Sequence, residues 1–147
     1  MIYLIREIKK EEINQLLELY TQMNNVLPTI DDSVLLLWEN ILSNKNYHII
    51  VAEEDEKIVS SCTCVIIPNL THNQRPYAFV ENVVTDINYR NRGLATACLD
   101  YAKEIALNNN CYKIMLMTGS KRETTLNFYK NAGYNSEDKT AFIMHLE

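Results

Sequence analysis

This chain of 147 residues has little glycine and little proline, three of each. Such scarcity leaves little room for flexible linkers or low-complexity segments. No internal repeat is visible, which argues against a solenoid. No apolar run approaches the roughly 20 residues that a membrane-spanning helix requires, and Arg6 and Glu7 follow Met1 too closely for a signal peptide. The sequence therefore predicts a single domain over residues 1–147 with no membrane partner.

Motifs for nucleophilic or metal chemistry are also missing. His48, His72 and His145 fall in separate predicted elements, and no Ser or Cys nucleophile motif lies near them. The four cysteines fall in apolar strand or helix patterns, and no His/Cys pair completes a zinc site beside Cys62 and Cys64. We therefore expect no metal, and we expect buried, reduced thiols in a cytoplasmic protein.

Positive charge is in deficit, with 14 Lys and Arg against 19 Asp and Glu and a net charge of −5. This balance disfavours a nucleic-acid partner and favours a cationic one, such as an amine. The composition, 47% hydrophobic and 22% charged, is that of a folded globular domain. Against the acidic background, Arg90 and Arg92 form a basic turn.

Hydrophobic periodicity predicts a mixed α+β sheet with helices on both faces, in the order β-α-α-β-β-β-α-β-α-β. The expected strands cover residues 2–8, 47–52, 58–67, 78–85, 112–117 and 140–146. The expected helices cover residues 9–23, a segment capped at 31–33 that buries Val34, Leu37, Trp38 and Ile41, then 94–108 and 123–132. The strand, helix and strand between 78 and 117 imply a right-handed parallel βαβ unit.

The most informative stretch is Tyr89-Arg90-Asn91-Arg92-Gly93-Leu94-Ala95, which links the strand at 78–85 to the next helix. Unpaired N–H groups at a helix start, the helix dipole and two arginines all favour a phosphate there. Gly93 lets the backbone approach an oxyanion closely, and the small Ala95 keeps the first helical turn from crowding it. The turn therefore predicts a phosphate or pyrophosphate site.

The pattern Arg90-x-x-Gly93-x-Ala95 after a strand resembles the acetyl-CoA pyrophosphate loop of the GNAT superfamily of N-acetyltransferases, and the order of elements is similar to the GNAT fold. The resemblance implies that acetyl-CoA binds as a co-substrate. Its pyrophosphate would contact the amides of Arg90, Asn91, Arg92, Gly93, Leu94 and Ala95 and the hydroxyl of Thr96. Its pantetheine arm would pair with the backbone of Val83, Val84 and Thr85, in a strand that carries a bulge in this family, and one of these amides would polarise the thioester carbonyl.

A second segment, Leu126 to Tyr134, resembles the aromatic-Tyr-x-x-x-Gly-aromatic segment of the same superfamily. The resemblance implies that Tyr129 protonates the departing thiolate as a general acid. Many members have an Asn seven residues earlier, where this chain has Arg122, so that contact is either lost or replaced. Asn127 is a further candidate for a polar contact to the cofactor.

A base is needed because alkylamines are protonated at neutral pH. The family often has a Glu at the position of Glu81, two residues before Val83 and so expected on the same strand face. Glu81 could act directly or through water, or it could be a surface carboxylate that pairs with Arg or Lys.

The sequence thus indicates an acetyl-CoA-dependent N-acetyltransferase that acts on a primary amine of a small molecule or peptide by direct attack in a ternary complex. The acceptor is not specified. Two stretches, 79–84 and 111–114, are also similar to glucosamine-phosphate N-acetyltransferases, in which case Arg75 or Arg122 could hold the sugar phosphate. A non-catalytic acyl-CoA-binding or regulatory module is the other open reading. Dimers are common in the family, so the resemblance allows a homodimer.

Overall fold

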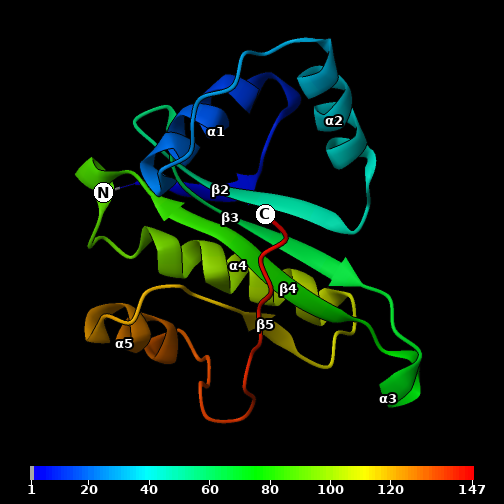
Figure 1. Cartoon of the computed structure of the whole chain (residues 1–147). Helices are drawn as coiled ribbons and strands as arrows, with labels where there is room; N and C mark the ends of the chain where they lie inside the picture. The colour runs from blue at the N-terminus through cyan, green and yellow to red at the C-terminus, as the bar shows by residue number, and fades with distance from the viewer. Residues whose placement is uncertain (1) are drawn as a thin grey trace.

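A computed structural model describes residues 2–147 as one five-stranded mixed sheet with helices on both faces (Figure 1). The strands lie in the order β1-β2-β3-β4-β5, and β5 is parallel to β4 while the other neighbours are antiparallel. The strand bounds are β1 Leu4–Glu7, β2 Tyr47–Glu54, β3 Lys57–Ile67, β4 Tyr77–Thr85 and β5 Ile114–Leu116. The predicted fold class is confirmed.

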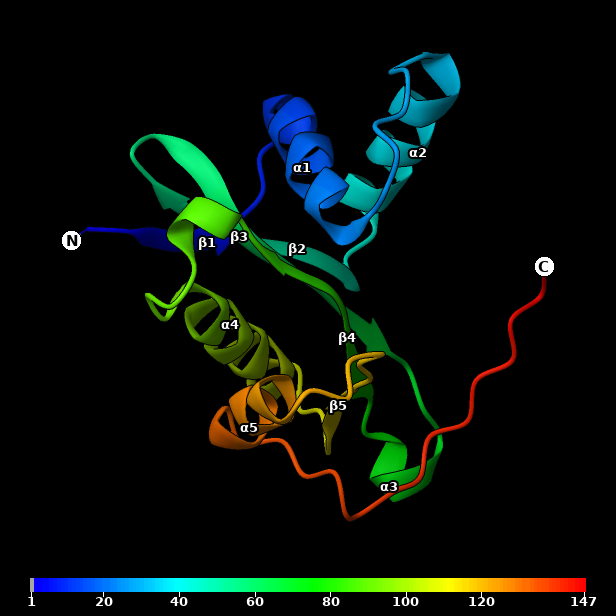
Figure 2. The same cartoon turned by 60° about the vertical axis from the view of Figure 1, so that its left-hand side comes forward.

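The helices divide between the two faces of the sheet. Figures 1 and 2 show α1 and α2 over one face and α4 and α5 over the other. The helices are α1 Ile13–Tyr20, α2 Asp32–Ser43, α3 Thr71–Gln74, α4 Leu94–Asn108 and α5 Glu123–Asn131, with 3-10 turns η1 Lys10–Glu12, η2 Thr21–Met23 and η3 Ile87–Tyr89. Within the described part of the chain, none of the helices is long and apolar enough to cross a membrane.

Each face of the sheet has its own hydrophobic cluster. Under α4 and α5 the cluster centres on Ile50 and Leu99, both essentially unexposed. Under α1 and α2 it includes Leu16 and Trp38, and the Trp38 indole N–H donates to the Lys10 carbonyl at 2.9 Å. Burying a side chain of this size contributes about 1.5–3 kcal/mol, so these contacts hold both helical layers against the strands.

A bulge in β4 positions the functional site. Ser61 pairs with Val84 and Thr63 with Glu81, so two residues of β4 lie opposite Cys62 alone. One of them, Asn82, has a φ of 55°, the left-handed conformation that Asn tolerates better than most residues. The pairing of β4 with β5 covers residues 78–80 and ends before the bulge. The sheet therefore opens between these two strands.

Three elements of the sequence prediction need correction. No strand forms over residues 140–146, because a strand requires a neighbour for its backbone hydrogen bonds and this segment has none among residues 2–147. Helix α2 buries Trp38 as expected, but Leu37 is 59% exposed, because only part of the apolar surface of the helix packs against the sheet. Strand β5 is limited to three residues.

Candidate functional site

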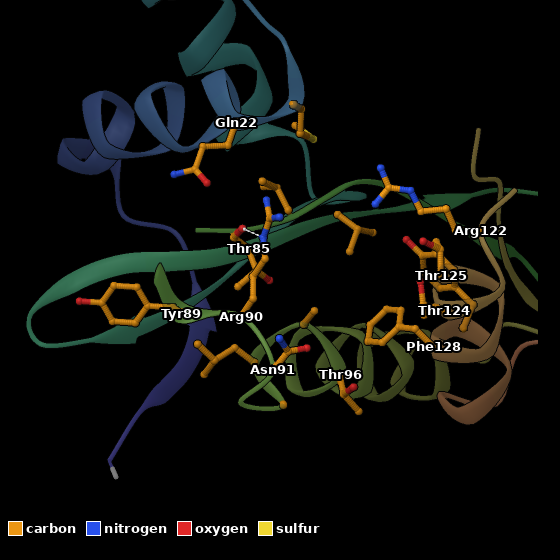
Figure 3. Close-up of a pocket in the computed structure, with 17 residues that line it drawn as sticks. Gln22, Thr85, Tyr89, Arg90, Asn91, Thr96, Arg122, Thr124, Thr125 and Phe128 are labelled. Atoms are coloured by element: carbon orange, nitrogen blue, oxygen red, sulfur yellow. Dashed lines mark hydrogen bonds between the residues drawn. The ribbon is translucent and has the colours of Figure 1, made fainter. Parts of the chain in front are cut away.

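A cavity of about 640 Å³ lies where β4 ends and α4 begins (Figure 3). Its volume is in the range of small-ligand sites. Gln22 approaches it from η2, Thr85 and Arg90 from the strand end and turn, and α5 forms the remaining wall (Figure 3). The residues that line it are Gln22, Met23, Val83, Val84, Thr85, Tyr89, Arg90, Asn91, Gly93, Leu94, Ala95, Thr96, Arg122, Thr124, Thr125, Phe128 and Tyr129.

The turn before α4 has the backbone shape of an anion site. Asn91 and Gly93 both adopt left-handed conformations, with φ of 62° and 80°, and Gly93 is the residue that caps the helix. The first helical N–H groups have no partner within a helix, and the residues that carry them, Leu94 to Thr96, line the cavity. Six of the seven predicted loop residues lie together here.

The two arginines of the turn have different roles. The Arg90 side chain lines the cavity, and its Nε donates to the Thr85 carbonyl at 3.0 Å. Arg92 is not among the lining residues. Its guanidinium bonds to Oε2 of the buried Glu54 at 2.6 Å and lies over the Tyr89 ring. Arg92 therefore fastens the turn to β2, a role that the sequence did not reveal because its partner is 38 residues away.

The strand end contributes the three residues expected from the sequence. Val83, Val84 and Thr85 all line the cavity, beside the bulge that the family resemblance predicts. Buried Ser60 fixes this end, because its hydroxyl bonds to the Val84 carbonyl at 3.1 Å and to the Thr85 hydroxyl at 2.7 Å. The backbone is therefore held in place without a ligand.

Tyr129 projects from α5 toward the same cavity. Its ring is half-buried and makes edge-to-face contacts with Phe128 and Tyr134, at centroid distances of 5.0 and 6.4 Å. Burial raises the pKa of Tyr129 above its ordinary value, and the nearby Cys62 thiol adds to the effect. The phenol is therefore protonated at neutral pH, as a proton donor must be.

Four of the lining residues were not expected at the site from the sequence. Thr124 and Thr125 place hydroxyl groups in the first turn of α5, and Gln22 and Met23 come from η2. Gln22 also accepts a hydrogen bond from the Ile87 backbone at 2.8 Å, which ties η2 to η3. Thr and Gln at these places show no periodicity or spacing, so the sequence held no signal for them.

Glu81 lies on the other side of the sheet from its expected place. The bulge reverses the alternation of β4, so Val83 packs into the cluster under α4 whereas Glu81 faces α1 and α2, opposite Thr63. The expectation of a shared face is wrong for this reason. Glu81 is exposed and is not a lining residue of the cavity. Burial, and then the negative charge of Glu81, raise the pKa of Tyr47, which places that phenol near the carboxylate.

The structure also locates Asn127, a predicted cofactor contact, and the side chains that could bind a metal. Asn127 is exposed on α5 and does not line the cavity, so its contact to a cofactor has no support from the geometry. Across residues 2–147 there is no group of three or more His, Cys, Asp or Glu side chains arranged to hold a metal ion. All four cysteines are buried and free.

Known proteins resemble this chain in sequence and in fold. A protein from Agrobacterium tumefaciens str. C58, provisionally assigned as an acetyltransferase, is 35% identical and superposes with a TM-score of 0.90 over 97% of this chain and 99% of that one. A transcriptional regulator from Bacillus halodurans C-125 is 25% identical, with a TM-score of 0.87 over 98% and 99% of the two chains. Glucosamine 6-phosphate N-acetyltransferase from Trypanosoma brucei brucei is 32% identical over 83 residues, which is 56% of this chain and about half, 54%, of that protein.

The family assignment does not depend on any single relative. The sequence description of the Acetyltransferase (GNAT) family matches residues 3–134, which include β4, the turn at Arg90–Ala95 and α5. The same residues build the bulge, the left-handed turn and the cavity wall described above. This chain belongs to the acetyltransferase (GNAT) family.

Proposed function

We propose that the protein transfers an acetyl group from acetyl-CoA to a primary amine of a small molecule or peptide. The observation that carries the proposal is the cavity itself: it joins the unpaired amides of the α4 start to the bulged strand and to the Tyr129 phenol. Helix-start amides bind the diphosphate of the donor, and the open strand edge binds its pantetheine arm.

The reaction we propose is direct attack in a ternary complex. The neutral amine forms a C–N bond to the thioester carbonyl carbon, and the negative charge that develops on the carbonyl oxygen is stabilised by a backbone N–H of Val83, Val84 or Thr85. The tetrahedral intermediate then loses its C–S bond, and Tyr129 donates its proton to the leaving thiolate. The nitrogen, which carries a positive charge after attack, gives up one proton as the amide forms, and that proton restores the phenol through solvent. Catalysis depends mainly on holding the two substrates in this geometry.

The amine loses its proton to Glu81, directly or through water. The carboxylate lies on the α1 and α2 side of the sheet, so the acceptor would enter from that side while the donor lies along α4. If Glu81 is the base, Glu81→Gln lowers kcat at pH 7 by about tenfold or more. Activity recovers toward pH 10, because the amine deprotonates without help. A pH–rate profile tests this, with the exposed Glu104→Gln as control; parallel profiles for both variants would remove Glu81 from this role.

A glucosamine phosphate is a specific candidate for the acceptor, because one curated relative is a glucosamine 6-phosphate N-acetyltransferase. The phosphate of such an acceptor needs a positively charged side chain to bind it. Arg75 is already engaged, since its guanidinium donates to the Asn110 and Cys111 carbonyls at 3.1 and 3.0 Å. Arg122 lines the cavity and is the better candidate.

A regulatory module that binds acyl-CoA without turnover is the second candidate. The transcriptional regulator that superposes on 98% of this chain favours it. Such a module would retain the α4 anion site but would not need Glu81 or Tyr129. Binding alone therefore does not separate the two functions, and turnover must be measured.

Release of free CoA thiol from acetyl-CoA tests the proposal. Purified protein is incubated with acetyl-CoA and a panel that holds glucosamine 6-phosphate, glucosamine, a polyamine, an amino acid and a short peptide. The four native thiols are buried, so their reaction with a thiol reagent adds little background in the folded protein. Turnover with at least one amine supports the transferase. CoA binding without turnover across the panel would favour the regulatory module.

We also propose that the protein works in the cytoplasm. Burial raises the pKa of Cys64 and Cys98 to about 12, which keeps these thiols protonated and unreactive. Four such cysteines suit a reducing compartment. Imaging of a tagged protein in cells tests this, and signal confined to a membrane or to the outside of the cell would contradict it.

A further inference from the structure

The end of α1 and the 3-10 turn η2 lie against the bulged part of β4. Helix α1 packs against β3 and β4, and its last residue, Tyr20, is half-buried in the hydrophobic cluster on that side of the sheet. The turn η2 continues the helix, because the Thr21 hydroxyl donates to the Glu18 carbonyl at 2.6 Å and the Asn24 N–H donates to the Thr21 carbonyl at 3.2 Å. The turn is therefore a fixed extension of α1.

Gln22 connects η2 to the chain just after β4. Its side-chain oxygen Oε1 accepts a hydrogen bond at 2.8 Å from the backbone N–H of Ile87, which lies beyond the last paired residue of the strand, Thr85. Figure 3 shows Gln22 on the α1 side of the sheet and Thr85 at the strand end, and both line the cavity. The chain that leaves β4 is thus tied to the helical layer as well as to the sheet.

Tyr20 reaches the same strand at the bulge. Burial raises the pKa of its phenol, and the side chains of Thr63 and Asn82 act in the opposite direction through hydrogen bonding, so the hydroxyl lies within reach of both. Thr63 lies on β3 opposite the start of the bulge, and Asn82 is the left-handed residue of the bulge. Tyr20 and Gln22 therefore meet β4 before and after the three strand residues that line the cavity.

This stretch of β4 has few other supports. Its pairing with β5 covers residues 78–80 and ends before the bulge, so one edge of residues 83–85 is open toward the cavity. On the other edge, β3 pairs with this stretch only through Ser60 and Ser61. A backbone with so few partners shifts easily unless side chains from another layer fix it.

We propose that Tyr20 and Gln22 are positioning residues for acetyl transfer: they clamp β4 from the α1 side and so aim the backbone N–H that stabilises the thioester oxyanion. This inference rests on the proposed function, because the oxyanion belongs to that reaction. An N–H stabilises the oxyanion best at about 2.7–3.1 Å, and a displacement of about 1 Å can lower the rate about 10²-fold. Tyr20 does not line the cavity, and the Gln22 oxygen is engaged by Ile87, so both act through the backbone.

Gln15 provides a matched control for the clamp. Its Oε1 accepts a hydrogen bond from the Ile58 N–H at 3.0 Å, so it is another glutamine of this helical layer that binds a backbone N–H outside the layer. Ile58 lies near the start of β3, and neither residue lines the cavity. A contact of the same kind is therefore lost in Gln15→Met and in Gln22→Met. The two variants separate an effect on stability from an effect on positioning.

Steady-state kinetics with acetyl-CoA and an accepted amine give the first test. Tyr20→Phe and Gln22→Met each remove a hydrogen-bonding group and keep most of the side-chain volume. We expect kcat and kcat/KM to fall together, by about tenfold in each variant, because the loss is felt in the transition state. In Gln15→Met, kcat should stay within about twofold of the wild-type value. An unchanged kcat in either clamp variant, or an equal loss in Gln15→Met, would overturn the proposal.

Gln22→Glu adds a second kinetic signature. The carboxylate keeps an acceptor oxygen for the Ile87 N–H, but it brings negative charge beside the predicted anion site. The KM for acetyl-CoA should therefore rise while kcat stays near the wild-type value. A fall of kcat as large as in Gln22→Met would contradict a role that depends on the Ile87 contact.

Amide hydrogen exchange in the protein without cofactor tests the clamp independently of catalysis. Tyr20→Phe and Gln22→Met should speed exchange across residues 82–87 by about tenfold, and residues 78–80 should not change because β5 pairs with them. Gln15→Met should leave both stretches as in the wild type. If the wild type turns over no amine, the proposed function fails, and faster exchange would still support the clamp. Exchange across 82–87 that is the same in all variants would show that the clamp does not hold the strand.

Discussion

Tyr129 is held on α5 between Phe128 and Tyr134, and burial keeps its phenol protonated. At the scale of single residues, we propose that this hydroxyl donates a proton and that Gly93 gives the turn its left-handed backbone conformation. Gly93 was expected from the glycine-containing turn that precedes a helix, whereas the role of Tyr129 was expected only from the resemblance of its segment to a GNAT motif. Glu81 was also expected, but its side of the sheet was not, since one left-handed residue, Asn82, reverses the alternation after it.

Removing the Tyr129 hydroxyl tests its role. Tyr129→Phe keeps the ring contacts, so we expect CoA affinity to change by less than about twofold while kcat falls about 10²-fold or more, as for loss of a general acid. Steady-state kinetics and calorimetry measure the two quantities. Because burial raises the pKa of Tyr129, ionisation of this group should lower the wild-type kcat only at a higher pH than an ordinary phenol with a pKa near 10 would allow. Unchanged turnover in Tyr129→Phe would exclude it as the acid.

Gly93 and Gly133 form a matched pair for testing the turn. Their φ angles are +80° and +104°, and an added Cβ meets nothing within 4 Å at either position. Alanine therefore costs about 1–2 kcal/mol of backbone strain at both sites rather than a clash. Since Gly93 but not Gly133 lines the functional cavity, we expect Gly93→Ala alone to weaken CoA binding, by about tenfold. Equal Kd values for the two variants would mean that the turn does not hold the cofactor.

At the scale of elements, β2, β4 and α4 are joined through the turn at Arg90–Ala95. Glu54 of β2 is 4% exposed and pairs with Arg92, while Ser60 of β3 bonds to the last residues of β4. These contacts make the turn rigid before a ligand arrives. A preordered anion site avoids part of the entropy cost of binding.

A double-mutant cycle measures the Glu54–Arg92 contact. Arg92→Met leaves the buried carboxylate without its guanidinium and is expected to cost about 2–3 kcal/mol, toward the lower end for broken buried pairs because Arg92 is partly exposed. Adding Glu54→Gln should restore part of that loss. Urea unfolding gives the free energies, and CoA affinity should fall with Arg92→Met. Purely additive effects would show that the pair does not fasten the turn.

The elements also show what the sequence could and could not predict. Helix α4 and β4 were located to within a residue or two, because periodicity and Gly93 mark their ends. The bulge was expected only from the family resemblance, since Asn82 carries no local signal for it. The strand at 140–146 was predicted from its alternation, but alternation shows only that a segment can bury one face, not that its own chain provides the partner.

At the scale of the whole molecule, buried ionisable groups make stability depend on pH. Burial raises the pKa of Cys64 and Cys98 to about 12, and it raises the pKa of Tyr20 and Tyr129 as well. A raised pKa in the folded state adds stability that is complete below the unfolded value, near 8.5 for a thiol. That stability is lost as the pH rises toward 12.

We therefore expect the free energy of unfolding to fall steadily between pH 8.5 and pH 11. Urea denaturation at pH 7.5, 9 and 10.5, with reductant present, measures the slope. Cys64→Ala should be less stable than the wild type at pH 7.5, because it leaves a small cavity, but it should lose less stability with rising pH. A wild-type stability that stays flat to pH 10.5 would contradict the burial of these thiols.

The central claim is that the start of α4 binds the diphosphate of acetyl-CoA. A crystal structure of the protein with acetyl-CoA tests it most directly. We predict diphosphate oxygens within hydrogen-bonding distance of backbone N–H groups between Arg90 and Thr96, with the thioester sulfur near the Tyr129 hydroxyl. Well-ordered cofactor density at any other place on the molecule would contradict it.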